Sequence, residues 1–209
     1  MKKLFIGIIT LIMTTGVYAQ NYSYFDNDVR FAKDGNPIVT LTHFGVFPIT
    51  EKFGFTDYAS VEGDNLYGYG QVLLGGYYNF TDELSVYLLA GKESISNQAR
   101  FAGMLYYTTG DSVRAYAFYQ RNENPFSGDT INSEWYDFML RLAMTSKDEN
   151  STYIGARYMK YYGLGVPISF RQALSPTSNL YVGYTHYYDV DNDYSGDWTP
   201  TLTLAIEFL

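Results

Sequence analysis

Apolar and polar side chains alternate with a period of two residues along most of the chain. The clearest example is the C-terminus, where Leu202, Leu204, Ile206 and Phe208 alternate with Thr201, Thr203, Ala205 and Glu207. The same pattern recurs over residues 84–91, 135–145 and 180–185. Because successive side chains of a strand point to opposite faces, this period predicts β-strands with one apolar face. After residue 20, no segment keeps a helical period or an apolar run long enough for a transmembrane helix.

Turn-forming residues divide the chain into strands of similar length. Short connections at 80–83, 109–112, 147–151 and 175–179 alternate with longer ones at 92–98, 122–133 and 189–199. We predict strands over 38–47, 53–62, 66–80, 84–93, 99–109, 113–121, 134–147, 151–162, 166–174, 179–190 and 199–209. The weaker alternation over 22–31 adds a twelfth strand, whereas a loop excursion at 166–174 would leave ten. We prefer twelve, because single-chain bacterial barrels have even counts and both chain ends then lie on the periplasmic side.

Composition turns this set of strands into a membrane prediction. Tyr, Phe and Trp make up 19% of the chain. Tyrosine doublets at 77–78, 106–107, 161–162 and 187–188 fall near predicted strand ends, where a membrane–water girdle places amphipathic rings. A secreted soluble barrel or sandwich would also alternate, but it has no reason to concentrate tyrosine there. Strands satisfy their backbone in lipid only when they close. We therefore predict an all-β fold, a transmembrane antiparallel up-and-down β-barrel.

The N-terminus has the features of an export signal. Lys2 and Lys3 precede an apolar stretch over 4–13, and Val17-Tyr18-Ala19 offers a cleavage site before Gln20. We expect residues 1–19 to be a signal peptide and 20–209 to be one barrel domain. The chain has no cysteine, which excludes disulfides, thiolate metal sites and cysteine nucleophiles. Its net charge of −8 disfavours nucleic acid as a partner.

The last predicted strand carries a resemblance to known proteins. It alternates apolar residues and ends on Phe208-Leu209, and so resembles the C-terminal strand of bacterial outer-membrane proteins, although there the aromatic residue is last. The chain is also similar to small twelve-stranded channels for nucleosides or acidic oligosaccharides. This resemblance implies a place in the bacterial outer membrane, in contact with its lipid. It also implies recognition of the C-terminal strand by the barrel-assembly machinery.

Arginine provides the most informative polar pattern. One arginine falls on each of five consecutive predicted strands, namely Arg100, Arg114, Arg141, Arg157 and Arg171. A three-residue turn at 148–150 would place Arg141 opposite Arg157. A mid-depth charge on the lipid face is costly and opposed like charges destabilise a sheet, so we expect both in the lumen, compensated there. Asp137 and Glu207 are the candidate acids. The set is either a cationic strip that attracts anionic or polar solutes, or an ion-pair network that plugs the barrel; we favour the solute path.

Other candidate chemistry is weaker. His43 and His186 both fall on the more apolar face of their strands, whereas a hydrolase triad needs histidine beside a nucleophile and an acid. We expect interfacial histidines, no catalytic residues and no zinc site. The acidic run 189–193 begins like a calcium loop but has Tyr194 and Pro200 where glycine and glutamate are required. Glycines at 68, 70, 75 and 76 lack the dinucleotide spacing and are better explained as relief of crowding in a bent strand. No metal and no cofactor is predicted.

Three functions remain open from the sequence. The leading one is passive passage of small hydrophilic solutes, with anionic ones among the candidates, through an outer-membrane channel. The second is a non-conducting barrel with a structural or surface-binding role carried by its extracellular loops. The third is an outer-membrane enzyme that modifies lipid. Conductance would separate the first from the second, and lipid hydrolysis would identify the third.

Overall fold

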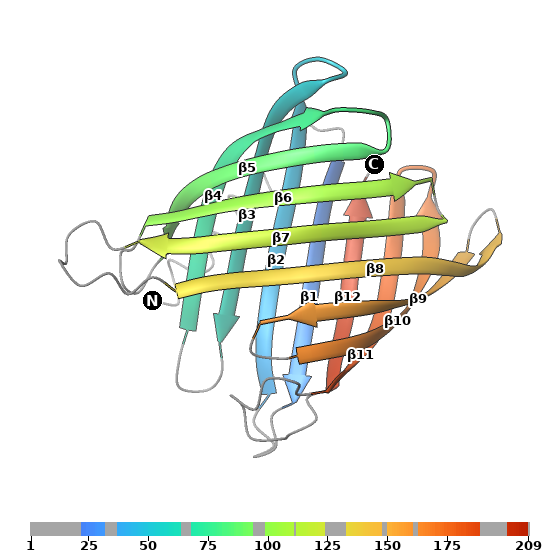
Figure 1. Ribbon diagram of the computed structural model, residues 1–209. Coiled ribbons are helices and arrows are strands. Elements are labelled where there is room, and N and C mark those ends of the chain that lie inside the picture. The colour runs from blue at the N-terminus through green and yellow to red at the C-terminus, as the bar shows by residue number, and fades with distance from the viewer. Residues whose placement is uncertain are drawn as a thin grey trace.

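Twelve antiparallel strands close into a single barrel (Figure 1). The computed structural model describes residues 22–31, 37–63, 68–93, 99–110, 112–123, 133–147, 150–160, 163–188 and 200–208. The strands are β1 (Tyr22–Phe31), β2 (Pro37–Pro48), β3 (Phe53–Gly63), β4 (Gly68–Asn79), β5 (Leu84–Glu93), β6 (Ala99–Thr109), β7 (Val113–Glu123), β8 (Ser133–Lys147), β9 (Asn150–Met159), β10 (Gly163–Ser175), β11 (Ser178–Tyr188) and β12 (Pro200–Phe208). Each strand pairs with its neighbours in the chain, and β1 pairs with β12. The predicted twelve-stranded barrel is confirmed, including the two weak segments.

The two ends of the barrel differ in their connections. Short turns join β2 to β3, β4 to β5, β6 to β7, β8 to β9 and β10 to β11 at one end, which we call the turn end. The start of β1 and the end of β12 lie there too, since Ser23 pairs with Phe208. The opposite end is called the loop end. The expected signal peptide, the acidic run 189–193 and most of the longer connections lie outside the described residues.

Apolar side chains cover the outside of the barrel. Leu140 and Leu204 are 43% and 51% exposed, whereas their neighbours Arg141 and Thr203 line an interior cavity. A continuous apolar outer surface of this kind is unfavourable in water and suits the hydrocarbon of a bilayer. The phase predicted from the sequence for β8 and β12 is therefore confirmed. Among the residues described, no helix is long and apolar enough to span a membrane.

Glycine allows β4 and β5 to approach closely. A Cβ added to Gly75 would lie 1.9 Å from the backbone oxygen of Leu88, and one added to Gly91 would lie 1.9 Å from that of Val72. Real Cβ atoms do not approach backbone oxygens so closely, so only glycine fits this geometry. The interpretation of Gly75 as relief of crowding in a bent strand agrees with these distances.

The tyrosine doublets divide between the two faces of the wall. Tyr78, Tyr107 and Tyr188 are 42–44% exposed on the outside. Their partners Tyr77, Tyr106 and Tyr187 line the cavity instead. We expected both tyrosines of each doublet to lie in the membrane–water girdle, and for these three pairs this was wrong. Adjacent residues of a strand point to opposite faces, so only one tyrosine of each pair can face the membrane. The doublet at 161–162 lies outside the described residues.

Candidate functional site in the barrel lumen

The interior of the barrel holds a cavity of about 730 Å³. Its lining includes Tyr22 and Asn79 near the turn end, and Glu62 and Glu134 near the loop end. The cavity therefore follows the barrel over most of the length of its strands. Every strand supplies alternate side chains to this interior, so the sequence pattern decides which chemistry the lumen presents.

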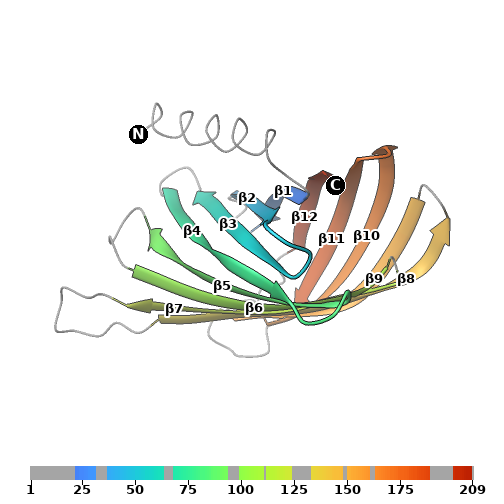
Figure 2. The same cartoon turned by 90° about the horizontal axis from the view of Figure 1, so that it is seen from above.

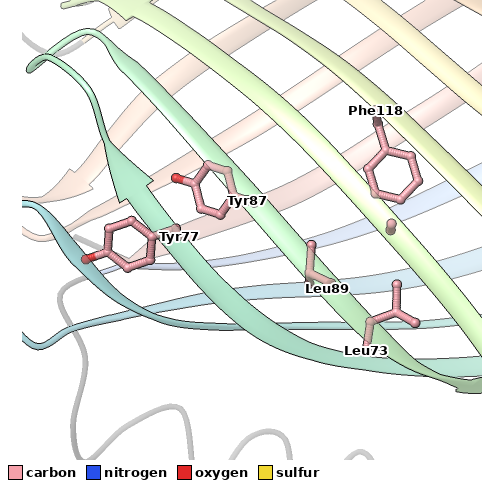
Figure 3. Close-up of a cluster of buried hydrophobic side chains, with 6 residues drawn as sticks. Leu73, Tyr77, Tyr87, Leu89 and Phe118 are labelled. Carbon is pink, nitrogen blue, oxygen red and sulfur yellow. The ribbon is translucent and has the colours of Figure 1, made fainter.

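Aromatic and aliphatic side chains form one part of the lumen wall. Leu73 and Tyr77 of β4, Tyr87 and Leu89 of β5 and Phe118 of β7 are all buried and pack into one cluster (Figure 3). The Tyr77 and Tyr87 rings stack with centroids 5.6 Å apart. This cluster thickens the wall from the inside and narrows the polar part of the lumen.

Arg157 is held by a buried carboxylate. Its Nε and Nη2 donate to Asp137 at 2.9 and 2.6 Å, a bidentate pair. The hydroxyl of Tyr116 donates to the same carboxylate at 2.8 Å. Because Asp137 is only 3% exposed, this pair fixes Arg157 against the wall.

Glu207 gathers a second polar group nearer the turn end. Arg114 lies 3.3 Å from one of its oxygens, and the side chains of Asn179 and Tyr181 donate to the other at 2.8 Å. Arg114 also donates to the hydroxyl of Tyr181 at 2.9 Å. The carboxylate of Glu207 is therefore satisfied by three side chains from two strands, β7 and β11.

The remaining arginines lie toward opposite ends. Arg100 lines the cavity near the loop end, where it pairs with Glu93 and donates to Gln71 at 3.1 Å. Arg171 is buried and donates to Ser151 at 3.4 Å nearer the turn end, away from the cavity lining. All five arginines thus occupy interior positions, but they do not form one continuous strip.

The register of β8 differs from the sequence-based expectation. Arg141 lies opposite Gly155 of β9 and opposite Arg114 of β7, and Arg157 lies opposite Met139. Placing Arg141 opposite Arg157 was wrong by two residues. The turn pairs Lys147 directly with Asn150, and an irregularity between Ala143 and Thr145 adds one residue to β8.

Among the residues that the structure describes, Arg141 differs from the other cavity-lining arginines in having no acidic partner. It lines the cavity between the Arg157–Asp137 pair and Arg114. Within the described part of the chain, its guanidinium has no hydrogen-bond or ion-pair partner, and its Nε is buried without one. A half-buried arginine in this condition has capacity to bind an anionic or polar group that enters the lumen.

Acidic residues on the opposite wall were missed by the sequence reasoning. Asp26 and Asp28 of β1 and Glu62 of β3 line the same cavity. Thr203 donates to Asp28, and Thr40 donates to Glu62 at 3.0 Å. β1 and β7 are six strands apart in the closed ring, and Figures 1 and 2 show β6–β9 facing β1 and β12 across the barrel. The alternation of Asp26 and Asp28 with Phe25 and Val29 on the opposite face of the strand could have indicated a lumen face.

Both histidines lie on the outer face, as predicted. His186 lies between Tyr184 and Tyr188, and its Nδ1 is 2.9 Å from the Tyr184 hydroxyl. His43 belongs to the outer face because its neighbours Thr42 and Phe44 line the cavity. Across the described residues, no group of three or more His, Asp or Glu side chains could hold a metal ion.

Comparison with solved structures shows that the chain shares its fold with porins of known structure. No family model matches the sequence, and no curated protein matches it. A KdgM porin superposes with a TM-score of 0.58 at 12% identity, over 89% of this chain and 98% of that one. A NanC porin gives 0.59 at 10% identity, over 88% and 99%. The chain has the fold of these porins. A TodX monoaromatic hydrocarbon channel gives 0.54 at 8% identity, over 95% and 91%.

Proposed function

We propose that this protein is an outer-membrane channel for passive passage of small hydrophilic solutes. The observation that carries the proposal is a cavity that runs along the barrel, with charged and hydrogen-bonding side chains beside aromatic ones in its lining, inside a barrel whose outer surface is apolar. Side chains at both ends of the strands line that cavity, so a solute meets hydrogen-bonding groups along its path. The lumen is proposed to select solutes by charge and shape and to carry out no bond chemistry.

The proposed location follows from the outer surface and the last strand. Exposed apolar side chains would contact outer-membrane lipid, and β12 alternates Leu202, Leu204, Ile206 and Phe208 outward. We infer that the barrel-assembly machinery recognises this strand. Closure of β12 onto β1 would then complete insertion, because an unpaired edge is unfavourable in lipid.

The charges of the lumen favour polar solutes that carry negative groups. Arg157 and Arg114 are neutralised by Asp137 and Glu207, whereas Arg141 faces the cavity without such a partner. A KdgM porin with the same fold has been solved in complex with disordered oligogalacturonate. We infer that Arg141 is the residue of the cavity that binds a carboxylate or another anionic group of the solute. Asp26 and Asp28, on the facing wall, would orient the rest of the solute.

Planar-bilayer recording tests the proposal. Wild-type protein should give stepwise conductance, and Met139→Trp, which adds bulk to the cavity lining, should reduce it severalfold. Leu140→Trp is the matched control, because it adds the same bulk one residue away on the lipid face and should conduct like wild type. A folded wild-type barrel that never conducts would contradict the proposal and favour the surface-binding alternative.

A further inference from the structure

Three polar side chains lie side by side on the outer face near the turn end. Ser23 Oγ lies 2.9 Å from His43 Nε2, and His43 Nδ1 lies 3.2 Å from an Asp57 carboxylate oxygen. A carboxylate beside Nδ1 favours the tautomer with its proton there, so that Nε2 can accept a proton from the serine hydroxyl. A nucleophile, a base and an orienting acid are therefore neighbours in space, in that order. This is the arrangement that activates serine.

The barrel register brings the three residues together from three strands. Ser23 of β1 lies opposite Gly45 of β2, Gly45 lies opposite Asp57 of β3, and His43 is the next residue of β2 on the same face. A Cβ on Gly45 would lie 2.2 Å from a carboxylate oxygen of Asp57 and 3.2 Å from the His43 ring. Glycine at this position leaves the space that lets the acid approach the imidazole.

The position of the three residues in the wall suggests a lipid as the substrate. They face outward, because Tyr22, Tyr24 and Tyr58, adjacent to Ser23 and Asp57 in the chain, line the lumen. Ser23 is the second residue of β1, so it lies close to the barrel's turn end. Lipid ester groups lie at this depth, between headgroups and hydrocarbon. Outward Phe55 on β3 and Phe208 on β12 provide apolar surface beside the site for an acyl chain.

We propose that Ser23, His43 and Asp57 form a catalytic triad that hydrolyses an acyl ester of a glycerophospholipid. Ser23 Oγ attacks the ester carbonyl carbon while its proton passes to His43 Nε2. The bond from that carbon to the alkoxy oxygen then breaks, and His43 returns the proton to the leaving alcohol. Water attacks the acyl–Ser23 ester, gives one proton to His43 and releases the fatty acid as Ser23 regains its hydrogen. Asp57 holds the imidazole in orientation throughout.

Phe25 controls access to this triad. Its ring centroid lies 4.4 Å from that of His43, and both Ser23 and His43 are buried. The ring of Phe25 must turn aside before an ester reaches Ser23 Oγ, and an acyl chain then replaces it against the imidazole. This chemistry takes place on the outer face and is independent of the solute path through the lumen.

Mixed micelles of detergent and dioleoylphosphatidylethanolamine test the proposal. The refolded full-length barrel should release oleate, and a fluorophosphonate probe should label Ser23. Ser23→Ala and His43→Ala should abolish both signals, and Asp57→Asn should lower kcat by up to about 10⁴-fold, the effect of the same change in a serine protease. Ser178→Ala is the matched control: Ser178 also lies opposite Phe208, and its hydroxyl contacts that of Ser175 at 2.7 Å.

Folding is checked separately from activity. Each variant should migrate as a folded barrel on unboiled electrophoresis, so that loss of activity reports chemistry and not misassembly. Oleate release that requires all three residues and survives Ser178→Ala supports the triad. Absence of oleate release from the folded wild type, with or without probe labelling, overturns it. Release that persists in Ser23→Ala overturns it equally.

Discussion

At the scale of single residues, the arginines divide into structural and available groups. Strand alternation predicted the interior face of Arg141, and the structure agrees. The identity of each partner depended on register, which a single irregularity in β8 changes by one residue. The sequence therefore indicated that Asp137 and Glu207 could compensate arginines, but it did not indicate which arginine would remain without an acid.

This division leads to different consequences for two substitutions. Arg141→Gln should shift the reversal potential in asymmetric salt toward cation preference with little change in stability, because no described carboxylate loses its partner. Arg157→Gln should lower the free energy of unfolding by about 3–5 kcal/mol, because it leaves Asp137 buried and unpaired. Reversal potentials and urea titrations of both variants measure the contrast. Equal stability losses in the two would show that Arg141 is also held by a partner.

The outer-face triad could not be predicted from the sequence at this scale. The phase of His43 was correct, but the two side chains beside it come from β1 and β3, 20 residues before it and 14 residues after it in the chain. No spacing motif links Ser23, His43 and Asp57. Only the pairing of β2 with both strands places them side by side.

At the scale of strands, the two-residue period was the decisive signal. It predicted β8 and β12 with their faces in phase, and it identified the weak β1 from Tyr22 to Phe31. A bulge cannot be recognised in such a pattern. The one inserted residue changes which residues of the two strands are paired, but it leaves only a small disturbance in the alternation of apolar and polar residues. The irregularities in β8 and β10 therefore had to come from the structure.

Close approach between strands gives a test at this scale. Gly75→Ala should destabilise the barrel by about 1–3 kcal/mol, since its Cβ would lie 1.9 Å from the Leu88 backbone oxygen and the strands must separate. Gly103→Ala is the matched control on β6, where the nearest atom would be 3.8 Å away. Urea titration of the folded fraction, followed by unboiled electrophoresis, compares the two. A neutral Gly75→Ala variant would show that β4 and β5 relax freely.

At the scale of the whole molecule, closure determines what the lumen contains. Twelve strands place β1 across the barrel from β7, and so Asp26 and Asp28 line the same cavity as Arg141 and Arg157. Local patterns along the chain carry no information about which faces meet across a ring. The acidic wall was missed for that reason, although strand number and phase together would have been sufficient to place it.

The pairing of β1 with β12 is the one contact that turns this sheet into a closed wall, and engineered cysteines can test it. The native chain has no cysteine, so a pair introduced at Asn27 and Leu204, which lie opposite each other, is free of competing thiols. Paired residues of adjacent strands have Cα atoms about 4.5–5.5 Å apart, within the range of a disulfide. Oxidation of Asn27→Cys/Leu204→Cys should therefore join the two ends of the chain and change its mobility on a denaturing, non-reducing gel.

Asn27→Cys/Val182→Cys is the control, because Val182 pairs with Leu204 from the other side and lies two strand spacings, about 9.5 Å, from Asn27. Cross-linking of the control but not of the first pair would mean that β12 does not lie between β1 and β11.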